Sequence, residues 1–398
     1  MRSLNRSRHD VVIVGGRVAG SATAMLLARL GHDVAVVDQA LFPSDTMSTH
    51  SIAGSGVVQL HRWGLLDAVL ASGAPAIRQV TFHALGESVT RQIRPKAGVD
   101  LVVAPRRYAL DAIVAAAARR AGAAVRTGVT VTGLRRDGGG RVSGICGHDR
   151  GGAPVELAAR YVVGADGLRS AVARLAGAAI NEARPAGGAA QYAYYAGIGW
   201  DGMELYVAER AFAGVFPTHG GQACIWVCTP TADARAARRG AASRAEAFGG
   251  LLARSAPRLA GRLAAASRTS PVQGVLRQPN QLRQAWGPGW ALVGDAGYYR
   301  DAITAHGISD AFRDAELLAA ALDRALGADA EEAAALAAYR RQRDRALREV
   351  FEITCRLGGY PPVPAFTALQ KQLSAAIDAE AAALAARPIL GQRLLATA

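Results

Sequence analysis

The stretch from Asp10 to Asp38, DVVIVGGRVAGSATAMLLARLGHDVAVVD, reads as a strand, a tight turn, a helix and a second strand. Val11 to Val14 is an unbroken apolar run followed by glycines, which is typical of a parallel strand buried on both faces. From Val18 to Arg29 the apolar residues recur with a helical period. Val34 to Val37 predicts a second buried strand that stops at Asp38.

This pattern predicts a dinucleotide site, in which the turn places backbone N–H groups under a pyrophosphate and Asp38 accepts from ribose hydroxyls. The three positions that the fingerprint reserves for glycine hold Gly15, Arg17 and Gly20. Either the motif has decayed and binds nothing, or the Arg17 guanidinium folds over the phosphates in a bidentate contact. The flanking strand, helix and terminal acid favour the second interpretation, so we expect a phosphate clamp.

The composition describes a large globular protein. The chain has 398 residues, of which 51% are hydrophobic and 20% charged, which allows two domains or one domain with an inserted lobe. The net charge of +14 is almost wholly due to arginine, since only Lys96 and Lys371 are lysines. The arginines are dispersed along helical stretches, as on solvated faces, so we expect no nucleic-acid partner. The alternative partner for a basic surface is an acidic protein, such as a carrier domain that holds the substrate, and the sequence does not decide this question.

The cysteines and the hydropathy pattern bear on location. The cysteines form no CxxC pair and have no nearby histidine cluster, so we expect no metal site and a reduced, cytoplasmic protein. The basic start MRSLNRSRHD lacks the apolar run of a signal peptide, and no segment approaches the length of a membrane span.

Beyond Asp38 the chain continues as a polar loop that contains His50, followed by a helix. A loop returning from the second strand toward the first helix passes near the middle of an extended dinucleotide, where His50 can act as an acid or base. The alternative, a structural hydrogen bond or exposure to solvent, fits slightly better.

Residues 77–103 predict a hairpin or two strands, and residues 187–228 predict several strands. A helical stretch is expected from about 243 to 265, with strands near 271 and 282.

Three motifs in order extend the first observation: the modified glycine turn that ends at Asp38, GADGLRS at 164–170, and GDAGYYRDAITAHGISDAFRDA at 294–315. Together they resemble the single-component (group A) FAD-dependent monooxygenases of the aromatic-hydroxylase type, whose superfamily includes geranylgeranyl reductases and flavin-dependent halogenases. The resemblance spans roughly residues 10–325, and three ordered motifs are far more specific than one glycine turn.

The resemblance implies an α/β fold. A Rossmann-like FAD-binding domain of the GR2 type is expected to be interleaved with a smaller mixed-sheet substrate domain and followed by a helical C-terminal tail. The expected segments are FAD-binding parts at 8–75, 104–175 and 286–326, substrate parts at 76–103 and 176–285, and helices at 327–398.

The resemblance also implies roles for single residues toward FAD. Gly15, Arg17 and Gly20 would hold the pyrophosphate, and Asp38 the adenosine ribose. Arg107 matches an arginine that reaches the cofactor from the second helix of the family.

The other two motifs imply contacts nearer the flavin. Asp166 matches a motif that supports both FAD and a transiently bound NAD(P)H, and Gly294 with Asp295 matches the acid that bonds the ribityl chain. Gly307 and Ile308 would offer backbone N–H groups to the flavin N1–C2 carbonyl edge, where reduced flavin carries negative charge.

Two positions depart from the family pattern. Ala302 stands where proline is common, and His306 stands where glutamine often precedes the glycine. His306 either hydrogen-bonds flavin, peroxide or substrate, or simply replaces the amide. Halogenases of this superfamily carry a Trp-x-Trp-x-Ile-Pro segment and a catalytic lysine. The matching place here reads AFAGVFPT, and that half of the chain has no lysine except Lys96, so we do not expect a halogenase. There is no second glycine-rich Rossmann unit, so NAD(P)H should bind transiently.

The resemblance therefore implies a monooxygenase in which NAD(P)H reduces FAD, O₂ forms a flavin C4a-hydroperoxide, and one oxygen hydroxylates or epoxidises an apolar or aromatic molecule of secondary metabolism. Tyr192, Tyr194, Phe216 and Trp226 of the strand-rich lobe would contact this substrate, although each can equally be sheet core. His50 and His306 are the candidate catalytic residues. The alternatives are a reductase or desaturase of the geranylgeranyl-reductase type and a flavin-retaining cyclase without redox chemistry.

Overall fold

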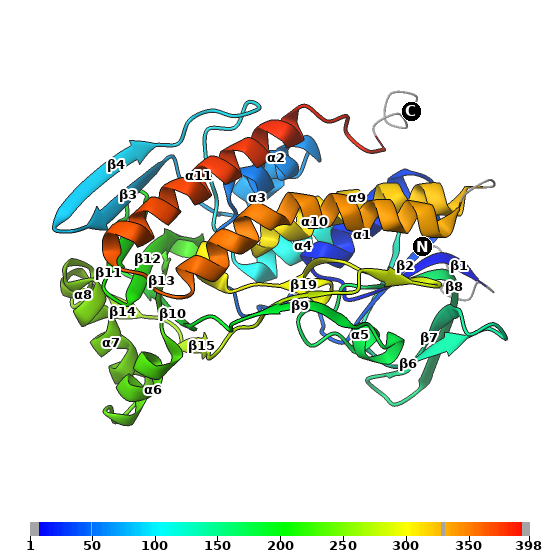
Figure 1. Cartoon of the computed structure of the whole chain (residues 1–398), viewed down its shortest axis with the longest axis horizontal. Helices are drawn as coiled ribbons and strands as arrows, with labels where there is room; N and C mark the ends of the chain where they lie inside the picture. The colour runs from blue at the N-terminus through cyan, green and yellow to red at the C-terminus, as the bar shows by residue number, and fades with distance from the viewer. Residues whose placement is uncertain (1–7, 49, 328–330, 392–398) are drawn as a thin grey trace.

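The computed structural model describes residues 8–48, 50–327 and 331–391. Its first sheet is built on the quoted strand–turn–helix–strand unit, in which β1 (His9–Val14) pairs in parallel with β2 (Val34–Asp38) and with β8 (Pro154–Gly164) (Figure 1). The strand order is β17–β18–β8–β1–β2–β5, where β5 is Ala124–Thr127, β17 Trp286–Gly287 and β18 Trp290–Leu292.

Both faces of this sheet are covered, which explains the unbroken apolar runs of its strands. Val11 and Ile13 pack on one face with the helices α1 (Val18–Arg29), α4 (Arg107–Arg120) and α9 (Gly307–Leu326). Val12 and Val14 pack on the other face with an antiparallel meander. The meander consists of β6 (Val129–Arg136), β7 (Val142–Asp149) and the first half of β8.

The second sheet gathers strands from two separate parts of the chain. Its order is β14–β10–β13–β12–β11–β3–β4, and β15 also pairs with β10. The hairpin of β3 (Gln79–Ala84) and β4 (Glu87–Gln92) joins in parallel beside β11, so the lobe built on the second sheet is interleaved with the first domain as predicted. The remaining strands are β10 (Ala189–Ala196), β11 (Met203–Ala208), β12 (Ala211–Pro217), β13 (Ala223–Thr229), β14 (Ser267–Arg268) and β15 (Gln273–Val275).

The helical stretch expected from about 243 to 265 is confirmed. It consists of two helices, α7 (Arg244–Ser255) and α8 (Pro257–Leu263), because Pro257 lacks the N–H that would continue the first helix and instead begins a new one. A preceding helix, α6 (Thr231–Arg239), was not predicted. The lobe meets the first domain beside a small sheet of β9 (Ile180–Arg184), β16 (Asn280–Arg283) and β19 (Tyr298–Tyr299).

The predicted helical tail is an integral wall of the molecule. α10 (Glu332–Leu357) packs on α9, and α11 (Val363–Ala385) runs from the second sheet to α2 (Gly54–Arg62) (Figure 1). The break between α10 and α11 falls at the GGYPPVP segment, where Pro361 and Pro362 stop the helix. Among the described helices, none has the length and apolar character that crossing a membrane requires.

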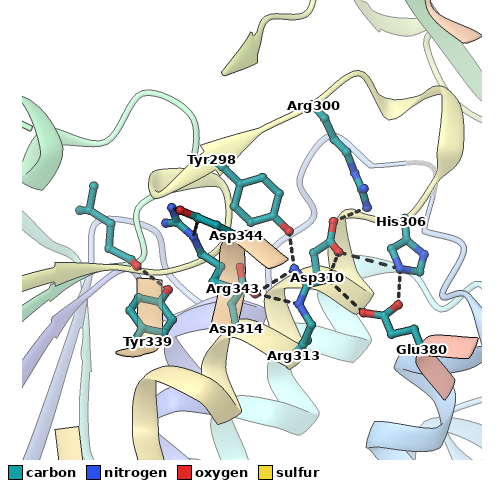
Figure 2. A network of polar contacts seen from close by, with 11 residues as sticks. Tyr298, Arg300, His306, Asp310, Arg313, Asp314, Tyr339, Arg343, Asp344 and Glu380 are labelled. Carbon is teal, nitrogen blue, oxygen red and sulfur yellow. Dashed lines mark hydrogen bonds and ion pairs between the residues drawn. The ribbon is translucent and has the colours of Figure 1, made fainter. Parts of the chain in front are cut away.

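A buried network of charges joins α9 and α11, and the charge of Arg343 on α10 acts on Asp314 of this network (Figure 2). The Arg313 guanidinium on α9 is 3% exposed and donates to Asp314 at 2.9 and 3.0 Å and to Asp310 at 2.8 Å. It also donates to Glu380 of α11 at 3.0 Å and to the Tyr298 hydroxyl at 2.9 Å. One cation thus serves three carboxylates, so removing it leaves negative charges buried without a partner.

We expect Arg313→Leu to lower the free energy of unfolding by about 3–5 kcal/mol, since the carboxylates of Asp310, Asp314 and Glu380 lose their shared donor. Urea unfolding of the FAD-loaded protein measures the loss. The control is Arg340→Leu, which removes an exposed arginine of α10. Equal unfolding midpoints for the two variants would show that the network contributes no more than a surface charge.

Candidate functional site

A first cavity of about 630 Å³ lies where the first domain's turns converge. It is lined by every residue predicted to bind FAD except Gly20, and by both candidate catalytic histidines. The predicted residues in its wall are Gly15, Arg17, Asp38, His50, Arg107, Asp166, Gly294, Asp295, His306, Gly307 and Ile308. Segments spread over almost 300 positions of the chain are therefore brought to one site.

The glycine turn is held by close backbone contacts. Gly15 has a φ of +102°, and a Cβ there would lie 2.4 Å from the Ala165 carbonyl oxygen. A Cβ on Gly20 would lie 1.8 Å from the Gly15 carbonyl oxygen, so Gly20 permits the helix to pack on the strand even though it does not line the cavity. Asp38 fixes the same turn, because its carboxylate accepts from the N–H groups of Gly16 and Ala40, both at 2.7 Å.

Arg17 occupies the helix start but is not free. Its guanidinium donates to the Asp111 carboxylate at 2.5 Å and to the carbonyl and hydroxyl oxygens of Ser44 at 3.3 and 3.2 Å. Arg107 donates to the same Asp111 carboxylate at 2.9 and 3.1 Å. Asp111 is 1% exposed, and it joins the two arginines predicted to reach the cofactor. Sequence reasoning missed it, although its spacing of four residues from Arg107 on a helix was a usable signal.

Asp166 and Asp295 differ in what they bind within the protein. The Asp166 carboxylate accepts from the Ser170 hydroxyl at 2.5 Å and from the N–H groups of Ala171 and Val172 at 2.7 and 3.1 Å, so it caps α5 (Ala171–Ala176). The Asp295 carboxylate accepts no hydrogen bond from any described residue. Asp295 is exposed and lines the first cavity, and the protein atoms packed around its carboxyl raise the pKa of that group to about 6 despite the nearby Arg107.

The start of α9 also presents unused polar groups to the cavity. Gly307 and Ile308 are the first residues of the helix, and their N–H groups have no acceptor among the described residues. A Cβ on Gly307 would meet nothing within 4 Å, so the space in front of it is open. Unpaired donors at a helix N-terminus and the unpaired acceptor Asp295 fit the carbonyl edge and the ribityl hydroxyls of FAD. The individual contacts of these residues with FAD stay predictions.

His306 precedes α9 and is wholly buried between two acids (Figure 2). Its Nε2 lies 2.8 Å from a carboxylate oxygen of Glu380 and 3.9 Å from one of Asp310. These three side chains lie close enough to bind a metal ion, but Arg300 and Arg313 already pair with the two carboxylates. The cluster is therefore an ion-pair network, and the partner on α11 was not anticipated from the sequence.

His50 has a hydroxyl partner instead. Its backbone φ is +67°, its side chain is buried, and its Nε2 hydrogen-bonds the Tyr194 hydroxyl. Burial and the charges of Arg107 and Arg106 hold the pKa of His50 well below its usual range, so the imidazole is neutral. Its Nδ1 has no partner among the described residues. The predicted structural hydrogen bond is present, while a catalytic role of His50 stays a prediction.

A second cavity of about 770 Å³ adjoins the first. The two share Ser51, Ala302 and Ala305 in their walls, which places the short segment before α9 at the junction. Phe216 and Trp226, two of the four aromatic residues predicted to contact substrate, line the second cavity, and that contact stays a prediction.

The other two predicted aromatic residues neighbour this wall without being part of it, since Tyr192 is directly opposite Trp226 in the sheet. The Tyr192 hydroxyl bonds Gln273 at 2.9 Å and Tyr194 bonds His50, and neither tyrosine lines the second cavity. Sequence reasoning missed the wall supplied by α11, which includes Leu373 and Ile377. Apolar residues four positions apart in an alanine-rich helix are ordinary packing residues, so their spacing gives no signal of a ligand.

Residues 8–354 match the family model described as FAD binding domain. The chain belongs to this family. FAD is accordingly its cofactor, as predicted, and the three motifs and the α/β fold agree with this membership.

Three similar proteins carry out three different reactions. Menaquinone reductase of Mycolicibacterium smegmatis is 32% identical over 180 residues, which cover 43% of this chain and 40% of that protein. Kynurenine 3-monooxygenase of Salinispora arenicola is 30% identical over 180 residues, or 42% of this chain and 38% of that one. The chain thus spans about two fifths of the length of these relatives. A triple mutant of the flavin-dependent brominase Bmp2 has a TM-score of 0.81 with 98% of each chain covered, and its 19% identity shows the fold alone.

We expect FAD affinity to depend on the protonation of Asp295. The carboxyl pKa of about 6 lies above the ordinary 3.8, so below pH 6 the acid is mostly protonated and is a weaker acceptor for ribityl hydroxyls than the carboxylate. Affinity should therefore be level above pH 6 and fall by up to tenfold per pH unit below it. Titration of the apo-protein with FAD between pH 5 and 8 measures this, and Asp295→Asn should abolish the slope. A slope that persists in Asp295→Asn belongs to another group.

We further expect Arg17→Gly to weaken FAD binding about ten- to hundred-fold, because it removes charge-assisted hydrogen bonds of about 1.5–3 kcal/mol. Arg17→Lys should recover part of the loss, since it lacks the planar fork. Asp111→Asn tests whether the buried acid orients Arg17: it should weaken FAD binding in the natural sequence more than in the Arg17→Gly background. If the Arg17→Gly protein binds FAD as tightly as the natural sequence does, Arg17 is not a phosphate clamp.

Proposed function

We propose that this protein is an FAD-dependent oxidoreductase that acts as a monooxygenase, using NAD(P)H and O₂ to hydroxylate or epoxidise an apolar small molecule. The observation that carries the proposal is the junction of the two cavities at Ser51, Ala302 and Ala305. One cavity holds the residues that fit FAD, and the other has a mainly apolar wall of a volume suited to a small molecule. A substrate in the second cavity therefore lies directly beside the cofactor.

Bound FAD supplies the electron transfer and the activation of oxygen. The protein's own contribution is to hold, orient and exclude water. The N–H groups of Gly307 and Ile308 stabilise negative charge at the start of α9, where the helix dipole adds to their effect. The buried aromatic side chains Phe216 and Trp226 keep water from the substrate end.

Neutral His50 holds a single ring proton at the wall of the first cavity, fixed in orientation by Tyr194. His306, by contrast, bonds Glu380, and in this proposal it fixes the start of α9 rather than touching substrate. No described unit resembles a second dinucleotide-binding turn, so NAD(P)H binds transiently from solvent. The substrate arrives free or tethered to a carrier protein.

A reductase is the second candidate, and the 32% identity to a menaquinone reductase favours it. Both candidates use the same FAD site and an apolar substrate cavity, and they differ in where the electrons go. A monooxygenase consumes one NAD(P)H and one O₂ and yields water and a product with one added oxygen atom. A reductase transfers two electrons and two protons to the substrate and needs no O₂.

We expect the purified protein to be yellow, with about one FAD per chain, and to oxidise NAD(P)H only when a substrate is present and O₂ is supplied. A panel of apolar aromatic compounds and quinones is assayed in air and under argon, with ¹⁸O₂ to label the product. A product heavier by one ¹⁸O atom supports the proposal. A reduced product formed equally under argon supports the reductase, and a rearranged product without NAD(P)H use supports a cyclase.

A further inference from the structure

The second cavity changes character from its buried end to its opening. Its buried end is formed by apolar side chains that are at most 4% exposed: Phe212, Phe216, Trp226, Cys228 and Ile303. Its outer wall carries the charged residues of the lining: Arg91, Arg94, Lys96 and Asp378. Arg91 and Arg94 are exposed, and both come from the β4 region. A ligand that fills this cavity therefore meets apolar groups inside and charges at the mouth.

The charge at the mouth is unbalanced. Asp378 of α11 is the one carboxylate in the described lining, and it is paired with Lys96. The guanidinium groups of Arg91 and Arg94 have no ion pair or hydrogen bond with any described residue. The charge of Arg94 is close enough to Lys96 to add to the effect of burial in lowering the pKa of that lysine. Two guanidinium groups thus stand at the opening without an anion.

The register of the hairpin directs Arg91 to the cavity side. Arg91 of β4 is directly opposite Val80 of β3, and such cross-strand partners share one face of a sheet. Val80 itself lines the second cavity. β4 is an edge strand, where charged residues also prevent pairing with other chains. Protection of an edge strand requires a charged residue somewhere on the strand. It does not require that the charge lie on the face that lines a cavity, as Arg91 does.

We propose that the substrate of this site is an apolar molecule that ends in an anionic group, a carboxylate or a phosphate. The anion binds Arg91 and Arg94, and the apolar body extends past Phe216 and Trp226 toward Ile303 and the junction with the first cavity. This inference rests on the proposed function only in taking the second cavity as the substrate site. The volume of about 770 Å³ accommodates a small molecule rather than a folded partner.

The test measures binding without turnover, so it does not depend on the reaction type. The FAD-loaded protein is titrated with the fluorescent anion 1-anilinonaphthalene-8-sulfonate and with uncharged N-phenyl-1-naphthylamine, which has the same apolar body. The double variant Arg91→Gln/Arg94→Gln should weaken binding of the sulfonate about tenfold and change that of the uncharged probe less than twofold. Displacement of the sulfonate by dodecanoate or by dodecyl phosphate then distinguishes the two anions.

The matched control is Arg235→Gln/Arg239→Gln, which removes two exposed arginines of α6 outside the cavity lining. It lowers the net charge equally and should leave both affinities unchanged. The proposal is overturned if the Arg91→Gln/Arg94→Gln protein binds the sulfonate as tightly as the natural sequence, or if both double variants weaken it equally. Because a loss of oxygenase activity does not enter this test, its outcome is separate from that of the proposed function.

Discussion

The buried guanidinium of Arg313 ties α9 to α11, two helices that supply walls of the two cavities. It pairs with Asp310 and Asp314 on its own helix and with Glu380 on α11, and α10 packs against the same helix. The first residues of α9 face the first cavity, and α11 forms part of the second. The position of one cavity relative to the other therefore depends on a cluster of charges that must all remain paired, because an unpaired charge at this depth is strongly destabilising.

The parts of the fold that local chemistry determines could be predicted from the sequence. The β1–α1–β2 unit follows from unbroken valine runs and from glycines whose absent Cβ atoms allow the backbone to approach within contact distance. The β3–β4 hairpin and the helix-capping acid Asp166 have similarly local signals. The helical stretch around 243–265 was predicted as well, and the break within it has a local signal in Pro257.

The candidate site was predictable only where a motif contained it. Family motifs led to the residues that line the first cavity, but they gave no information on what pairs with them. Asp111 lies 94 positions from Arg17, and Glu380 lies 74 positions from His306. Pairing over such distances depends on the tertiary fold, as does the exclusion of Tyr192 and Tyr194 from the lining of the second cavity. Tyr192 and Tyr194 are two positions apart on β10 and therefore share one face of the sheet with Trp226. Only the packing of the whole sheet decides which aromatic residues of this face line a cavity.

The crossed connectivity of the second sheet has a consequence for how the molecule is assembled. The hairpin β3–β4 gains its parallel neighbour β11 more than a hundred residues later, and the cavity beside it is closed by α11, which follows every other described element. Contacts so distant along the chain form slowly, because loop closure must precede any stabilisation from them. During synthesis at the ribosome, the apolar wall around Phe216 and Trp226 is complete before the helix that covers it exists. The growing chain thus exposes an apolar surface until the last helices have emerged. During this interval chaperones would protect the chain from aggregation.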